Sequence, residues 1–173
     1  MGEGRMGEGG IRVEFRFAER SFEVRGRTFT HRFLVLDPVV AVVAVDEGGR
    51  VLLVRQYRAA LDRRTLEVPA GYVEPGEAWE AAAARELEEE TGYRARRLEP
   101  VLTYWPAPGF CDQEVRIFRA EGLEAGATRF DPGEDLELVR LDPEACRAAI
   151  RDGGIRDGKT LVALFAAVLG PRP

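Results

Sequence analysis

Three short segments near the start of the chain, residues 11–17, 21–24 and 28–35, alternate between hydrophobic and polar residues. Alternation with a period of two is typical of strands, so these segments predict a small antiparallel sheet. Two apolar runs rich in valine follow at residues 38–45 and 51–57, separated by the turn sequence Glu-Gly-Gly. We expect these two runs to form central strands that pair with each other.

The clearest helix in the sequence covers about residues 77–91, a stretch rich in Ala and Glu. Acidic residues in its first turn complement the helix dipole, and Gly92 stands where a C-cap glycine is expected. The other predicted elements are an extended segment at 66–73, strands at 98–105, 114–120 and 136–141, and helices at about 143–151 and 158–169. Strands and helices mix without strict alternation, so we expect an α/β fold with a mixed sheet covered by helices on both sides.

Length and composition indicate a single domain. The 173 residues are 45% hydrophobic and 32% charged, which is the balance of a folded globular domain. The longest apolar runs, residues 39–45 and 161–169, are far shorter than the ~20 residues that a membrane span needs, and no signal-peptide pattern is found. A net charge of −5 disfavours nucleic-acid binding, and two cysteines are too few for a disulfide framework. We therefore expect a cytoplasmic protein that binds neither nucleic acid nor membranes.

Three glutamates, Glu86, Glu89 and Glu90, share one face of the predicted helix, because they are three and four residues apart. Such a cluster costs energy through like-charge repulsion unless a cation compensates it. Carboxylate oxygens are ligands that suit Mg²⁺ or Mn²⁺. A solvated acidic face is the alternative interpretation of these three residues taken alone.

The residues around this cluster resemble the Nudix box, Gly-x5-Glu-x7-Arg-Glu-U-x-Glu-Glu-x-Gly-U, in which U is bulky and apolar. The matching positions are Gly71, Glu77, Arg85, Glu86, Leu87, Glu89, Glu90 and Gly92. Only the last position departs, with Tyr93 where an aliphatic residue is usual. On this resemblance the chain is identified as a member of the Nudix hydrolases, which implies an α/β/α sandwich with a mixed sheet. Members of the family cleave a nucleoside diphosphate that is linked to another group.

The resemblance also implies roles for the box residues. The implied metal ligands are three carboxylates of the helix and one backbone carbonyl before the box: Glu86, Glu89, Glu90 and Ala70. Glu89 would also act catalytically, by orienting the attacking water. Arg85 and Glu77 would fix the loop and the helix to each other. The implied cofactor is Mg²⁺, with Mn²⁺ or Zn²⁺ as alternatives.

Outside the box, residues 37–167 resemble the ADP-ribose pyrophosphatase branch of the family. Arg58 and Glu67 stand where that branch contacts its substrate, which implies that Arg58 pairs with phosphate and that Glu67 accepts hydrogen bonds from an adenine amino group or a hydroxyl. Pro108 lies at the offset from the box that is typical of the branch, and the resemblance places Gly109 in the substrate-binding loop.

The branch takes its general base from an acidic loop before a late strand. Glu134 aligns best with that base, and Asp135 and Glu137 are alternatives. A surface acidic loop without a catalytic role is the other interpretation.

The resemblance divides the chain into three parts. Residues 1–10 are Gly-rich and predict a flexible tail, residues 11–36 form the N-terminal β segment, and residues 37–173 form the Nudix domain. In the branch, the β segment pairs with a second subunit, so a homodimer is expected. Arg27, or Arg25, would then reach the partner's phosphates. Strand packing is the alternative role for these side chains.

These expectations combine into one reaction, the metal-dependent hydrolysis of ADP-ribose to AMP and ribose 5-phosphate. A preference for FAD, NADH or a nucleotide sugar is the first alternative, since the box recognises only diphosphate and metal. A sensor that binds ADP-ribose without cutting it is the second.

Overall fold

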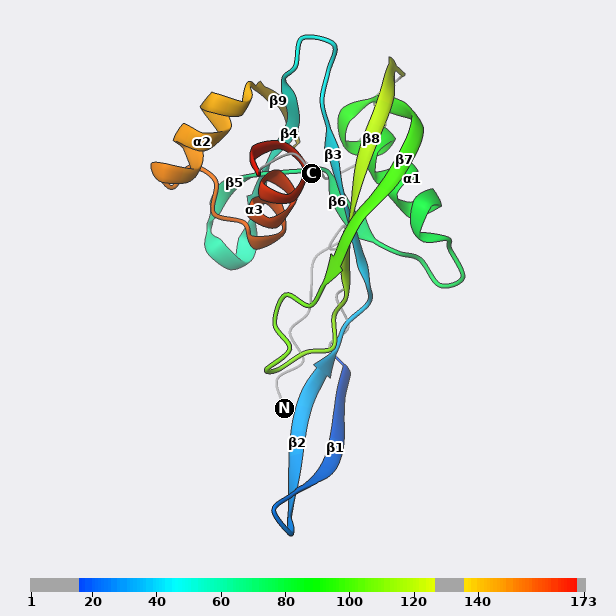
Figure 1. The fold of residues 1–173 in the computed structure, drawn as a ribbon, viewed down its shortest axis with the longest axis vertical. Coiled ribbons are helices and arrows are strands. Elements are labelled where there is room, and N and C mark those ends of the chain that lie inside the picture. The colour runs from blue at the N-terminus through cyan, green and yellow to red at the C-terminus, as the bar shows by residue number, and fades with distance from the viewer. Residues whose placement is uncertain (1–15, 127–135, 171–173) are drawn as a thin grey trace.

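The computed structural model describes residues 16–126 and 136–170 (Figure 1). A compact body of strands and helices carries one long hairpin that projects away from it. The predicted tail, residues 1–10, lies outside the described residues.

The projecting hairpin consists of β1 (Arg16–Val24) and β2 (Arg27–Val35), which pair antiparallel along their whole length. Arg25 and Gly26 form the turn, both with positive φ (51° and 71°), as a two-residue hairpin loop that matches the strand twist requires. The sequence predicted two separate strands at 11–17 and 21–24. That prediction is wrong, because the intervening residues also pair across to β2 and make one continuous strand.

The body contains a four-stranded sheet in the order β6-β3-β8-β7. Its strands are β3 (Val39–Ala44), β6 (Ala70–Tyr72), β7 (Tyr93–Tyr104) and β8 (Val115–Ala125). The β3–β8 pair is parallel and the other pairs are antiparallel, which confirms the mixed sheet. Alternate residues of β3 enter two different hydrophobic cores: Ala41 and Val43 face one, and Val40, Val42 and Ala44 face the other. This burial on both faces explains why the strand is continuously apolar.

A second sheet has the order β5-β4-β9, with β4 (Val51–Arg58), β5 (Arg63–Glu67) and β9 (Glu137–Leu141). A short 3-10 helix (Ala59–Leu61) joins β4 to β5. The expected pairing of β3 with β4 is wrong. Both edges of each strand are occupied by other strands, and β3 and β4 meet only near the turn, at the isolated bridge between Val45 and Val51.

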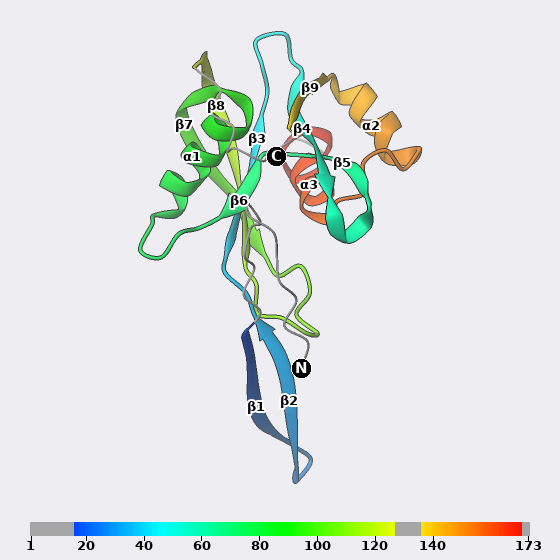
Figure 2. The same ribbon diagram turned by 180° about the vertical axis from the view of Figure 1, so that it is seen from behind.

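Helices cover both sides of the sheets, as expected (Figures 1 and 2). On one side α1 (Trp79–Thr91) packs Ala82, Ala83 and Leu87 into the core. It ends at Gly92, whose φ of 71° and bond from its N–H to the Glu88 carbonyl (2.8 Å) form the expected C-cap. On the other side lie α2 (Pro143–Arg151) and α3 (Gly158–Leu164), and a π-helical turn (Phe165–Leu169) extends α3. Within the described ranges, no helix is long and apolar enough to cross a membrane.

Candidate active site

Arg85 lies at the centre of the carboxylates of α1 and of the loop before it. Its Nε and Nη2 donate to the two carboxylate oxygens of Glu77, each at 3.0 Å, and Nη2 also donates to the Tyr72 carbonyl at 2.9 Å. Its Nη1 donates to Glu86 (2.6 Å) and Glu89 (3.2 Å). The hydrogen bonds to Glu77, followed by those to Glu86 and Glu89, raise the pKa of Arg85. One guanidinium therefore links three carboxylates and leaves this group with an excess of negative charge.

Gly71 and Ala70 join this cluster to strand β6. A Cβ at Gly71 would collide with the carboxylate of Glu86, so any other residue at this position would force that side chain to move. Glu90 is buried, and its Oε2 accepts a hydrogen bond from the Ala70 N–H at 3.0 Å. The structure thus brings Glu86, Glu90 and the β6 backbone together at one place.

The donor set of this place fits a hard divalent cation, because every side-chain donor is a carboxylate oxygen. The missing Cβ of Gly71 leaves the Glu86 carboxylate directly against the β6 backbone. Within the described residues, no group of three or more Asp, Glu, His or Cys side chains is arranged to hold a metal ion. Glu86 and Glu89 instead accept hydrogen bonds from Arg85. The set suits Mg²⁺ or Mn²⁺ better than Zn²⁺, which more often takes nitrogen and sulfur ligands.

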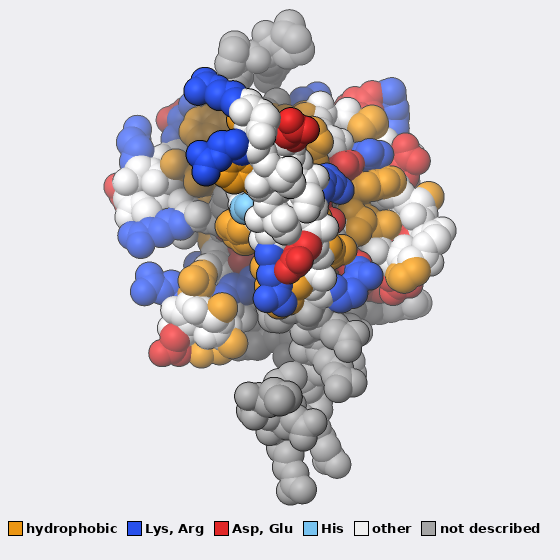
Figure 3. All heavy atoms as spheres, turned by 90° about the horizontal axis from the view of Figure 1, so that it is seen from below, with side chains coloured by type: hydrophobic (Ala, Val, Ile, Leu, Met, Phe, Trp, Pro, Cys, Tyr) orange, Lys and Arg blue, Asp and Glu red, His pale blue; other side chains and the backbone are white. Residues whose placement is uncertain are grey.

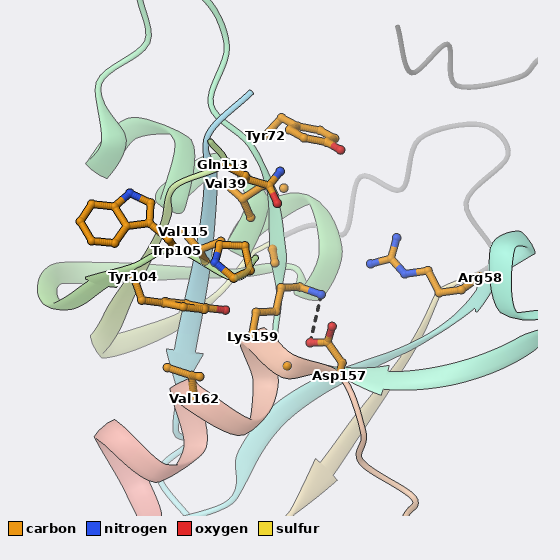
Figure 4. A pocket seen from close by; sticks show the side chains of 14 residues that line it. Val39, Arg58, Tyr72, Tyr104, Trp105, Gln113, Val115, Asp157, Lys159 and Val162 are labelled. Carbon is orange, nitrogen blue, oxygen red and sulfur yellow. Dashed lines mark ion pairs between the residues drawn. The ribbon is translucent and has the colours of Figure 1, made fainter. Parts of the chain in front are cut away.

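A cavity of about 630 Å³ lies beside this cluster and has Ala70 and Gly71 in its wall. This volume is within the usual range for a small-molecule site. In Figure 4, Tyr104 and Trp105 lie at one side of the cavity and Arg58 at the other. The charged residues that line it are Arg58, Asp157 and Lys159. The cavity therefore combines an aromatic side with a charged one. We refer to it as the aromatic cavity.

Behind Arg58, the carboxylate of Glu67 is buried with only 2% of its surface exposed. Arg58 Nε and Nη2 donate to its two oxygens at 2.9 and 2.7 Å, and Lys159 and Thr65 also donate to it. Burial alone would raise the pKa of Glu67, but the Arg58 hydrogen bonds and the charge of Lys159 outweigh burial and lower the pKa to about 2. Two cations thus hold one buried carboxylate, whereas in the Arg85 cluster one cation holds three carboxylates.

Beyond the Glu67 hydrogen bonds, the charge of Glu90 also affects the pKa of Arg58. The Glu67 hydrogen bonds are the main cause of its raised pKa, and the charges of Glu90 and Asp157 act in the same direction. The Arg58 side chain is 41% exposed and lines the aromatic cavity, whereas Glu67 does not line it. Arg58 is therefore accessible from the aromatic cavity, whereas Glu67 is not.

Lys159 is the residue that sequence reasoning missed. It stands near the start of α3, where it forms ion pairs with Glu67 and with Asp157 (3.1 Å to Oδ2) and lines the aromatic cavity. Asp157 also caps α3 by accepting from the Thr160 N–H at 2.9 Å. One signal was available, since Lys159 is the single lysine in a chain with 25 basic residues.

The predicted substrate loop is anchored to the hairpin. His31 Nε2 lies 3.1 Å from the Gly109 carbonyl, and the Leu34 N–H donates to the Phe110 carbonyl at 2.8 Å. Trp105 and Pro106, at the start of the loop, line the aromatic cavity, whereas Gly109 does not.

Four other predicted residues either do not line the aromatic cavity or lie outside the described residues. Arg27 lies at the far end of the hairpin, with its guanidinium 5.8 Å from the Phe29 ring centre (Figure 1). Glu134, with its alternative Asp135, lies outside the described residues. Glu137, the other alternative, begins β9 and pairs with Arg55 at 3.1 Å rather than lining the cavity.

Comparison with known proteins adds independent information. Residues 35–161 match the NUDIX domain family. An ADP-ribose pyrophosphatase of Bacillus subtilis is 38% identical over 127 residues, which cover 72% of this chain and 69% of that protein. A methanol dehydrogenase activator of Bacillus methanolicus is 33% identical over 141 residues, covering 80% and 76%. A crystal structure of an ADP compounds hydrolase superimposes with a TM-score of 0.79 at 23% identity, covering 91% of this chain and 86% of that one.

Proposed function

The chain belongs to the Nudix hydrolase family, and from this premise we propose that it hydrolyses the pyrophosphate of ADP-ribose to AMP and ribose 5-phosphate. One observation carries the proposal: the aromatic cavity lies beside the carboxylate-rich Arg85 cluster and has the two cations Arg58 and Lys159 in its lining. A metal-bound diphosphate needs both kinds of charge at once. The ADP-ribose pyrophosphatase of Bacillus subtilis, at 38% identity, supports the choice of substrate.

Each side of the aromatic cavity has a part in this reaction. When bound by Glu86, Glu89 and Glu90, a divalent cation would neutralise the diphosphate and activate water for attack on phosphorus. Arg58 binds a phosphate oxygen, and Glu67 orients its guanidinium for that contact. This differs from the expected contact of Glu67 with adenine, because the carboxylate is buried and already accepts bonds from Arg58, Thr65 and Lys159.

The aromatic wall of the cavity suits a nucleoside. Trp105 is 64% exposed and lines the cavity, so its ring is available for stacking on a base. Burial, with the charge of Asp157 acting in the same direction, raises the pKa of Tyr104 to about 12. The Tyr104 hydroxyl therefore stays protonated at neutral pH and can donate a hydrogen bond to a ribose or phosphate oxygen.

We assign catalytic roles to Glu89, which would orient the attacking water, and to Glu134, which would act as general base. The Glu89 side chain is 42% exposed and accepts only the longest of the Arg85 bonds to the box carboxylates, so it can contact a water molecule. The role of Glu134 rests on the sequence resemblance alone.

A homodimer joined through the hairpin is part of the same proposal. Phe17, Phe22, Val24 and Phe29 are all more than 40% exposed along it. Figure 3, which views the molecule from the hairpin end, shows hydrophobic side chains interspersed with basic ones on this face. A second subunit would bury such a surface and bring Arg27 to the partner's site. Light scattering tests this point, and a monomer at working concentration removes it.

The substrate is tested with purified protein, Mg²⁺ and a panel of ADP-ribose, FAD, NADH and nucleotide sugars, with products separated by chromatography. The highest kcat/KM for ADP-ribose, with AMP and ribose 5-phosphate as products, supports the proposal. If another dinucleotide has a higher kcat/KM, the roles of the box residues stand and that dinucleotide is the substrate. Binding of ADP-ribose without turnover makes the chain a sensor instead.

A further inference from the structure

A second cavity, of about 790 Å³, lies on the other side of the Glu67 ion pairs, and we refer to it as the basic cavity. It is open to solvent and is lined by the β4–β5 connection and by the segment between α2 and α3. Its cationic side chains are Arg58, Arg63, Arg64, Arg156 and Lys159, against the two carboxylates of Glu67 and Asp157. The basic cavity therefore has a clear excess of positive charge in a protein whose net charge is −5.

Both carboxylates that line the basic cavity already form ion pairs with cations of the cavity wall. Glu67 pairs with Arg58 and Lys159, and Asp157 pairs with Lys159 and caps α3. The guanidinium of Arg156 lies over Gly153, where a Cβ would meet its Nη2 at 2.6 Å, so the glycine allows this side chain to lie flat. Arg63 and Arg156 are exposed residues at the rim.

From this charge balance we propose that the basic cavity binds a small phosphomonoester, by its phosphate group. Arginine offers pairs of parallel N–H donors that match the oxygens of a phosphate, and several arginines converge here. The volume exceeds what a phosphate ion fills, and Ala60 and Leu61 add an apolar patch for the organic part of the ligand.

The basic cavity and the aromatic cavity share a wall. Arg58, Asp157 and Lys159 line both of them. A phosphate in the basic cavity competes with Glu67 and Asp157 for the two cations, which changes how Arg58 is presented on the other side. Ligand binding in the basic cavity therefore modulates substrate binding in the aromatic cavity, and this second step rests on the proposed function.

The binding step is tested without metal or substrate, using calorimetric titration of the full chain with inorganic phosphate and with ribose 5-phosphate at constant ionic strength. R63Q and R156Q each remove a donor that lines only the basic cavity, and each should weaken binding about tenfold. R151Q, which removes an exposed arginine at the end of α2 outside both cavities, is the matched control. Urea unfolding of each variant verifies that it is folded.

The outcomes separate the possibilities. Binding of ribose 5-phosphate that is weakened about tenfold in R63Q and R156Q but unchanged in R151Q supports the proposal. Equal binding in all four proteins places the ligand elsewhere, and absence of millimolar binding to the wild type removes the site; either result overturns the proposal. Because no turnover is measured, failure of ADP-ribose hydrolysis leaves this result unaffected.

Discussion

The Arg85 cluster and the Glu67 cluster are built from the same types of residue with opposite charge balance. In the first, one arginine binds three carboxylates, Glu77, Glu86 and Glu89. In the second, one buried carboxylate is held by Arg58 and Lys159. The first therefore attracts a cation, and the second presents Arg58 and Lys159 in the wall of the aromatic cavity. Placed around one cavity, the two provide what a metal–diphosphate complex requires.

The two clusters also differ in what they contribute to stability. Glu86 and Glu89 are partly exposed, with 12% and 42% of their side chains accessible, so their charge stays available for a ligand. Glu67 is buried, so its ion pairs hold β4, β5 and α3 together. We therefore expect changes in the first cluster to reduce activity and changes in the second to reduce stability.

The largest effect is expected on turnover in the Arg85 cluster. E86Q and E90Q each remove a charge that would bind the cation, so kcat/KM should fall by about 10³-fold, or ~4 kcal/mol of transition-state stabilisation. Initial rates with ADP-ribose measure this. The unfolding free energy of E86Q should stay close to that of the wild type. Full turnover in either variant contradicts the assignment.

The next effect is expected on stability in the Glu67 cluster. E67Q leaves Lys159 partly buried without its main partner, and it should reduce the unfolding free energy by ~3 kcal/mol. E137Q is the matched control, because Glu137 pairs with Arg55 on the surface and its loss should cost less than ~1 kcal/mol. Urea unfolding compares the two. Equal losses would mean that burial of Glu67 does not matter.

The third effect concerns the pH dependence of stability. The folded-state pKa of Glu67, about 2, is below its ordinary value of 4.5, so the unfolded chain takes up the proton first. The contribution of Glu67 is therefore complete above about pH 5 and is lost as the pH falls from about 5 toward 2. Unfolding measured at pH 7, 5, 4 and 3 should show a steeper acid loss in the wild type than in E67Q. Parallel curves would contradict the lowered pKa.

The smallest effect is expected at Gly71. In G71A the new Cβ displaces the carboxylate of Glu86, so affinity for Mn²⁺ should fall about tenfold. G48A is the control, because Gly48 lies in the turn before β4 and its Cβ would approach Asp46 Oδ1 at 3.2 Å and Arg50 Nε at 3.5 Å, away from Glu86. Unchanged Mn²⁺ affinity in G71A would show that Glu86 can move without loss.

The sequence predicted the Arg85 cluster well because its geometry is local. Helix periodicity places Glu86, Glu89 and Glu90 together, and the spacing from Gly71 to Arg85 fits one loop and two turns of helix. The Glu67 cluster depends on residues 92 positions apart, Glu67 and Lys159, which no local pattern connects. The expected contact of Glu67 with substrate accordingly overlooked its buried ion pairs.

The prediction that β3 pairs with β4 was wrong for a related reason. Two apolar runs joined by a short turn predict a hairpin, yet β3 pairs with β6 and β8 and leaves β4 to another sheet. Which edges are taken depends on the whole topology and not on the turn between the runs. The cytoplasmic location, the dimer and the role of Glu134 stay predictions from the sequence.

The central claim, that the two clusters have different ligands, is tested most directly by titrating Mn²⁺ into wild type, E86Q and E67Q and following free Mn²⁺ by electron paramagnetic resonance. E86Q should weaken Mn²⁺ binding by about tenfold or more, while E67Q should bind Mn²⁺ within about twofold of the wild type. Equal weakening in both variants, or none in E86Q, would contradict the claim.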